Sequence, residues 1–107
     1  MVKYLNIDEA VDLINKNDDV QLLDIRSSEE IAITGFIKDS VLVDLNDPNT
    51  EKLISGLDKQ KKYLLYCASG SRAGLVAIYM DKSGFSEVYS LRNAGYSQLA
   101  IALKNIN

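Results

Sequence analysis

The sequence predicts an α/β fold with a mostly parallel sheet of about five strands and helices on both faces. Short apolar segments of strand character alternate with helical patterns along the whole chain, which is typical of a parallel sheet covered by helices. Adjacent apolar residues such as Leu22 and Leu23 are expected where both faces of a strand are covered. The 107 residues are enough for one core, so we expect a single domain over residues 1–107.

The first half of the chain contains three expected strands, at residues 2–5, 20–25 and 41–45. Asn6 with Glu9, and Ser27 with Glu30, have the spacing of a capping box, so each pair is expected to begin a helix. The first helix carries apolar residues at helical spacing and ends within residues 15–18. The second helix ends at Gly35.

The second half of the chain contains two further strands, at residues 63–66 and 88–91. A turn at residues 46–49 precedes a weak helix. The apolar residues between Leu75 and Met80 predict the first turns of a buried helix, which ends at a left-handed glycine cap, Gly84. A turn at residues 93–95 leads into a last helix that carries Leu99, Ala100, Ile101 and Leu103.

Composition excludes several classes of function. The net charge of −3 makes nucleic acid an unfavourable partner, and no apolar run approaches the ~20 residues of a membrane span. One cysteine and no histidine exclude an internal disulfide, a cysteine-rich or histidine metal site and a histidine-based triad. No metal or cofactor is therefore expected. The N-terminus moves directly into a periodic pattern without signal-peptide features, so we expect a cytoplasmic location.

The only cysteine, Cys67, stands where an apolar strand meets a polar loop that precedes a helix. Unpaired N–H groups and the positive end of the helix dipole favour a thiolate at such a position. Arg72 adds a positive charge, and the small residues Ser69, Gly70 and Ser71 let the backbone close around an anion. A lone free cysteine is often an inert core residue. The glycine and arginine of the loop favour a reactive Cys67 over an inert one.

Asp24 and Arg26 end the second strand at the same sheet edge as Cys67, and parallel sheets bind ligands beyond this edge. In a functional interpretation, Arg26 helps to attract an anion and Asp24 supports the site. In the structural interpretation, which we favour, Arg26 pairs with Glu29 or Glu30 and Asp24 accepts hydrogen bonds from loop N–H groups. Glu29 and Glu30 are expected to provide only helix N-terminal charge.

The chain resembles the rhodanese-like family of sulfurtransferases over essentially its whole length, and three segments carry the resemblance. They are Leu22-Leu23-Asp24-Ile25-Arg26 with Glu29-Glu30, Gly35-Phe36-Ile37 leading into Val41-Leu42-Val43-Asp44-Leu45, and Tyr66-Cys67-Ala68-Ser69-Gly70-Ser71-Arg72. Gly84-Phe85 and Val88-Tyr89-Ser90-Leu91 also resemble that family. The resemblance implies a three-layer rhodanese-like fold.

The resemblance also implies a reaction. Cys67 would take a sulfur atom from thiosulfate or a persulfide, carry it as a persulfide held by loop N–H groups, and pass it to cyanide or a thiol. Arg72 would orient an anionic donor, and residues 68–71 would complete the binding loop. A protein is a further expected sulfur donor or acceptor. No histidine base is needed for this chemistry.

The spacing of the loop favours sulfur over phosphate. Four residues separate Cys67 from Arg72, whereas the phosphatases with the same fold have five, and the shorter loop suits a single sulfur atom. The chain also departs from the family. Ala68 replaces a frequent arginine and so removes a contact to thiosulfate. Ala94-Gly95 replaces a double glycine, while Phe36 and Leu99 replace a histidine and a tryptophan, and we expect the last two changes to concern packing.

Two other functions compete with sulfur transfer. A non-catalytic rhodanese-like module would bind or regulate a partner, but inactive members usually lack the cysteine that this chain retains. A redox sensor would oxidise Cys67 to a sulfenic acid, and no second cysteine is present to resolve that state.

Overall fold

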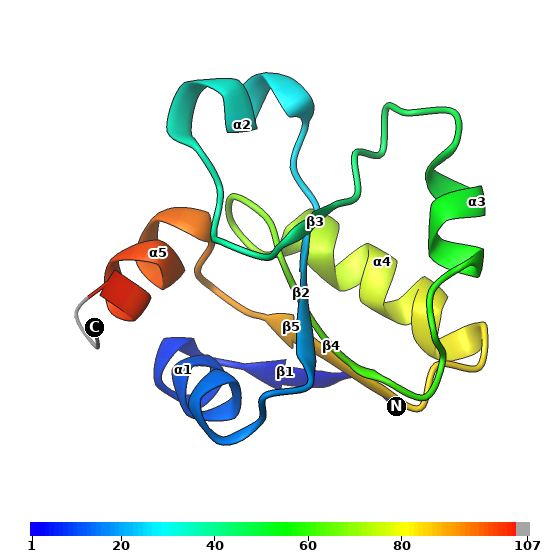
Figure 1. The fold of residues 1–107 in the computed structure, drawn as a ribbon, viewed down its shortest axis with the longest axis horizontal. Helices are drawn as coiled ribbons and strands as arrows, with labels where there is room; N and C mark the ends of the chain where they lie inside the picture. Colours follow the sequence, from blue (N-terminus) through cyan, green and yellow to red (C-terminus); the bar gives the residue numbers. More distant parts are fainter. Residues whose placement is uncertain (105–107) are drawn as a thin grey trace.

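The computed structural model describes residues 1–104 and contains a five-stranded sheet in the order β1-β5-β4-β2-β3 (Figure 1). Every pair of neighbouring strands is parallel, which confirms the predicted sheet. The strands are β1 (Lys3–Leu5), β2 (Val20–Asp24), β3 (Val41–Leu42), β4 (Lys62–Tyr66) and β5 (Glu87–Leu91). The strand β4 therefore lies in the centre of the sheet and leads into Cys67.

Helices cover both faces of the sheet, as predicted. Buried residues of α1 (Ile7–Lys16) and α5 (Tyr96–Lys104) join one core cluster, and those of α3 (Thr50–Ser55) and α4 (Ser71–Lys82) join another. The short helix α2 (Ser28–Thr34) has no buried residue and lies beyond the carboxyl ends of the strands, at the top of Figure 1. The helix α2 therefore belongs to the edge that carries Cys67.

The central strand β4 shows why the apolar runs are continuous. Leu64 belongs to the core beneath α1 and α5, and the adjacent Leu65 belongs to the core beneath α3 and α4. Both side chains are fully buried, because successive residues of a strand point to opposite faces. Burying a leucine stabilises the fold by roughly 1.5–3 kcal/mol. The same strand thus anchors both layers and fixes the position of the loop that follows.

The predicted caps are confirmed. Asn6 with Glu9 begins α1, and Ser27 with Glu30 begins α2, both as complete capping boxes. Gly35 ends α2 with φ +80°, and Gly84 follows α4 with φ +95°, a left-handed conformation that glycine adopts without strain.

The third strand is shorter than predicted, because it ends at Leu42 and not at Leu45. The backbone N–H of Val43 still donates to the carbonyl of Asp24 (2.8 Å), but the chain then turns. The Asp44 carboxylate accepts from the N–H groups of Asn46 and Ser28, at 2.9 and 3.1 Å. The bond from Asn46 forms a local turn, as aspartate commonly does, and the bond from Ser28 joins this turn to the start of α2.

The expectation of a buried helix after the cysteine loop is only partly correct. Ala73, Val76, Ala77 and Met80 of α4 are buried, whereas Leu75 is 68% exposed and Ile78 and Tyr79 also face solvent. The apolar residues of α4 thus extend beyond its sheet-facing stripe. Among the described residues, none of the helices is long and apolar enough to cross a bilayer.

Candidate functional site

Cys67 follows the last residue of β4 at the carboxyl edge of the sheet. Its side chain is fully buried in the core beneath α3 and α4, and its carbonyl accepts a hydrogen bond from the N–H of Tyr96 (2.8 Å). The neighbouring strand is tied to the same point, because the N–H of Ile25 donates to the carbonyl of Tyr66 (2.7 Å). Cys67 is thus held from β4, β2 and α5.

The Cys67 Sγ accepts two backbone hydrogen bonds, from the N–H of Gly70 at 3.0 Å and from the N–H of Ala73 at 3.4 Å. Gly70 is the N-cap of α4 and has φ +107°, and no side chain caps this helix. Ala73 occupies the N3 position, whose N–H normally bonds an N-cap side chain. The sulfur therefore replaces the missing cap, and both N–H groups stabilise negative charge on it.

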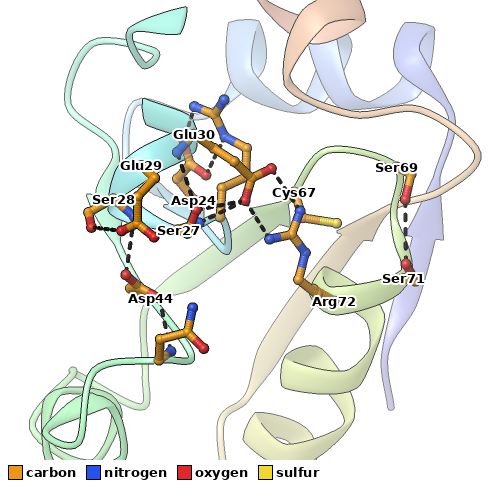
Figure 2. A network of polar contacts seen from close by, with 12 residues as sticks. Asp24, Ser27, Ser28, Glu29, Glu30, Asp44, Cys67, Ser69, Ser71 and Arg72 are labelled. Atoms are coloured by element: carbon orange, nitrogen blue, oxygen red, sulfur yellow. Dashed lines mark hydrogen bonds and ion pairs between the residues drawn. The ribbon is translucent and has the colours of Figure 1, made fainter. Parts of the chain in front are cut away.

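Two more N–H groups of the loop have no partner. Those of Ser71 and Arg72, in the first turn of α4, make no hydrogen bond within residues 1–104. The first N–H groups of a helix lack acceptors inside the helix and can bind an anion instead. The Ser69 and Ser71 hydroxyls lie 3.4 Å apart at the same loop (Figure 2). Residues 69–72 can thus surround a small, electron-rich group.

Gly95 explains why the loop has its shape. A Cβ atom at Gly95 would lie 1.9 Å from the Ala68 carbonyl oxygen and 2.6 Å from the Cys67 carbonyl oxygen. No side chain fits there, so the start of α5 packs directly against the backbone of the cysteine loop. The sequence contained this signal in Ala94-Gly95, but spacing alone did not indicate which backbone Gly95 contacts.

Arg72 forms a bidentate ion pair with Glu30, which joins α4 to α2 (Figure 2). The distances are 2.6 Å between Nη1 and Oε1 and 3.0 Å between Nη2 and Oε2. This hydrogen bond from Arg72 is the largest cause that lowers the pKa of Glu30 to about 2. The hydrogen bond to Glu30 likewise raises the pKa of Arg72, with a smaller contribution from the charge of Cys67.

The expectation that Glu30 provides only helix N-terminal charge is therefore wrong. Glu30 acts twice, because its carboxylate also accepts from the backbone N–H of Ser27 (2.9 Å) in the capping box. A capping-box glutamate points back toward the start of its helix, and α2 starts at the edge that carries Arg72. The position of Glu30 in the capping box, at the sheet edge that also carries Arg72, is the sequence signal that could have identified the Glu30–Arg72 pair.

Asp24 and Arg26 form a buried ion pair with each other. Arg26 is 3% exposed, and its Nε and Nη2 donate to the two Asp24 oxygens at 2.9 and 2.8 Å. It also donates to the Thr34 hydroxyl and the Gly35 carbonyl, and its guanidinium lies 3.9 Å from the centre of the Tyr96 ring. Burial opposes its charge, but the hydrogen bond and charge of Asp24 hold the pKa of Arg26 above its ordinary value.

This geometry corrects the expected pairing of Arg26 with Glu29 or Glu30, and that of Asp24 with loop N–H groups. Arg26 instead holds the end of α2 against the sheet and α5. Its contribution to substrate binding stays a prediction, and its Asp24, Thr34 and Gly35 partners already occupy four of its five N–H donors.

Ala68 is exposed and lines a small pocket of about 200 Å³ with Arg26, Glu30, Ile33, Thr34, Tyr96 and Ser97. We call it the loop pocket. Leu99 is fully buried, which agrees with a packing role. Phe36 is 57% exposed, so the expectation that Phe36 serves packing is wrong. Within residues 1–104, no group of three or more acidic, histidine or cysteine side chains could hold a metal ion.

A family model described as the rhodanese-like domain matches residues 6–100. The chain is 31% identical to the "Putative sulfurtransferase YtwF" of Bacillus subtilis over 87 residues, which cover 81% of this chain and 82% of that protein. It is 33% identical to a tRNA sulfurtransferase of Haemophilus influenzae over 75% of this chain but only 16% of that protein.

The fold matches a crystal structure of a rhodanese-like domain protein from Staphylococcus aureus with a TM-score of 0.76. That match covers 91% of this chain and 90% of the other, at 24% sequence identity, so it is evidence for the fold alone.

Proposed function

Because the chain belongs to the rhodanese-like domain family, we propose that it is a sulfurtransferase that carries sulfane sulfur on Cys67 as a persulfide. The similarity to sulfurtransferases supports the general activity. The observation that carries the mechanism is the pair of N–H groups, from Gly70 and Ala73, directed at the Cys67 sulfur at the start of α4.

The first step forms a sulfur–sulfur bond. The Cys67 thiolate attacks the outer sulfur of the donor, the donor's own bond to that sulfur breaks, and the electron pair leaves with sulfite or with the donor thiolate. In the second step, cyanide or a thiolate attacks the outer sulfur of the Cys67 persulfide and restores the Cys67 thiolate. Neither step consumes an external oxidant or reductant.

The N–H groups of the loop stabilise the negative charge on sulfur in both steps. The N–H groups of Gly70 and Ala73 stabilise the attacking and leaving Cys67 thiolate. The unpartnered N–H groups of Ser71 and Arg72 are available for the anionic outer sulfur, within the loop of residues 68–72. These donors are fixed by the helix and by Gly95, so they need no rearrangement during transfer.

The donor we favour is a persulfide or polysulfide. Thiosulfate carries two negative charges, and the loop pocket beside Ala68 offers little free positive charge to bind it. Ala68 has no charge, Arg26 is neutralised by Asp24, and Arg72 is paired with Glu30. A persulfide or polysulfide carries less negative charge than thiosulfate, so its binding depends less on positive charge near Ala68.

Thiocyanate formation from cyanide tests the proposal, with thiosulfate and an organic polysulfide as separate donors. We expect turnover with the polysulfide, weak turnover with thiosulfate, and none in Cys67→Ser. Ala68→Arg should increase the rate with thiosulfate more than the rate with polysulfide. No turnover from either donor, in protein whose Cys67 still reacts with iodoacetamide, would favour a non-catalytic binding module. A cytoplasmic location stays a prediction.

A further inference from the structure

An apolar groove lies between α5 and the segment that follows α2, close to the cysteine loop. It has a volume of about 520 Å³, and its walls include Phe36, Lys38, Tyr96, Ala100, Ile101 and Lys104. We call it the α2–α5 groove. Phe36 is 57% exposed and Ile101 62%, and Ile33, on α2 beside it, is 85% exposed. In Figure 1, the segment that leads from α2 to β3 passes beside α5.

The α2–α5 groove continues into the loop pocket. Tyr96 and Ser97 line both hollows, and Ala68, directly after Cys67, lines the loop pocket together with Glu30, the partner of Arg72. A chain segment lying in the groove would therefore reach the residues around the reactive sulfur. Tyr96 is itself fixed to the site, because its N–H donates to the carbonyl of Cys67.

The charge of the groove has the opposite sign to the charge of the chain. Among the described residues, its lining contains Lys38 and Lys104 and no carboxylate, although the chain has a net charge of −3. Within residues 1–104, neither lysine forms an ion pair, and the only carboxylate of the loop pocket, Glu30, is neutralised by Arg72. Two unpaired cations beside exposed apolar side chains complement a segment that is both acidic and apolar.

We propose that the α2–α5 groove docks a partner protein through an acidic, apolar segment that brings the partner's cysteine to Cys67. This inference rests on the proposed sulfur transfer and names its donor as a protein persulfide. The Cys67 thiolate attacks the partner's outer sulfur, the partner's sulfur–sulfur bond breaks, and the partner leaves as a thiolate. A segment docked in the groove would lie beside Ala68, the residue directly after Cys67.

Sulfur delivery from short synthetic peptides tests the proposal. Each peptide carries one cysteine persulfide, flanked by leucine and glutamate in one peptide and by leucine and lysine in the other, and cysteine persulfide serves as the small donor. The rate at which sulfur reaches Cys67 is followed by mass spectrometry of quenched protein. We expect the acidic peptide to deliver sulfur about tenfold faster than the basic peptide at low salt, with the difference shrinking as salt rises.

The variant Lys38→Glu/Lys104→Glu should reverse the preference between the two peptides and leave the rate with cysteine persulfide unchanged. Lys52→Glu/Lys61→Glu, which makes the same charge change at exposed positions outside the groove, should preserve the preference. Ile33→Gln/Ile101→Gln should lower the rate of sulfur delivery from the acidic peptide. Leu75→Gln, which changes a similarly exposed residue on α4, should leave that rate unchanged.

Three results would overturn the inference. Equal rates for the two peptides in wild-type protein would show that the groove does not select an acidic partner. A wild-type dimer that dissociates in Lys38→Glu/Lys104→Glu, seen by sedimentation velocity, would make the groove an interface between two copies. If neither cysteine persulfide nor either peptide delivered sulfur to Cys67, the proposed sulfur transfer itself would be rejected. The experiment therefore distinguishes failure of the docking from failure of the function.

Discussion

The Arg72 guanidinium and the Glu30 carboxylate meet through two hydrogen bonds, at 2.6 and 3.0 Å, and so join the first turns of α4 and α2. One of these helices carries the N–H groups that face Cys67, and the other lies over the same sheet edge. The pair therefore fixes the orientation of Arg72 and also neutralises most of its charge. We infer that Arg72 shapes the loop more than it attracts anions.

Glu30→Gln should lower the free energy of unfolding by about 0.5–1 kcal/mol, since the pair is about one-third exposed and solvent screens it. Glutamine retains the capping box, so the change isolates the ion pair. The matched control is Glu29→Gln, which removes an exposed carboxylate that, among the described residues, accepts a side-chain hydrogen bond only from Ser28. Urea unfolding measures both variants, and equal losses would contradict a specific contribution from the Glu30–Arg72 pair.

The same pair predicts a pH dependence of stability. The pKa of Glu30 falls from an ordinary value of 4.5 to about 2, chiefly through the hydrogen bond from Arg72. A carboxylate with a lower pKa in the folded state stabilises the fold above its unfolded pKa and loses that effect as the pH falls through its folded pKa. The stability difference between wild type and Glu30→Gln should be constant near neutral pH and should shrink between about pH 4.5 and 2. A difference that is unchanged at pH 2 would contradict the assignment.

Gly95 and Gly74 should respond to alanine in opposite directions. At Gly95 the new Cβ would overlap the backbone of Ala68 and Cys67, so Gly95→Ala should cost at least about 2–4 kcal/mol of stability and slow sulfur loading. At Gly74, inside α4, a new Cβ meets no atom within 4 Å, so Gly74→Ala should raise stability by about 0.5–1 kcal/mol. Thermal unfolding compares the two variants. Unchanged stability in Gly95→Ala would contradict the close contact of Gly95 with the backbone of the cysteine loop.

Ser90 predicts a stabilising substitution. Its hydroxyl lies buried in β5 without a hydrogen-bond partner among the described residues. A buried polar group with no partner costs free energy, so Ser90→Ala should raise the free energy of unfolding by about 1 kcal/mol. Ser86→Ala serves as the comparison, because it removes a hydroxyl that donates to the Lys59 carbonyl and should not stabilise. A loss of stability in Ser90→Ala would mean that the hydroxyl has a partner.

Local signals predicted most of the fold, because they act over a few residues. The capping boxes at Asn6 and Ser27, the apolar strand before Cys67 and the glycine after α4 are all readable in sequence order. Cys67 at a helix start was predicted for the same reason.

What the sequence did not predict depends on distant partners. The pair of Glu30 and Arg72 is separated by 42 residues, and the contact of Gly95 with Ala68 joins two loops. The exposure of Leu75 and Phe36 was also missed, since an apolar residue carries no local sign of which side of the molecule it faces. In the same way, the Asp44 carboxylate, just after the third strand, accepts a hydrogen bond from the N–H of Ser28 on another element.

The measurement that tests the central claim most directly is the intact mass of the protein after incubation with an organic polysulfide, and separately with thiosulfate. We predict that the polysulfide adds the mass of one sulfur atom to wild-type protein, that cyanide removes it, and that Cys67→Ser gains nothing. Addition from polysulfide but not from thiosulfate would agree with the low free charge around Ala68. No added sulfur from either donor, in folded protein with a reactive Cys67, would contradict the persulfide mechanism.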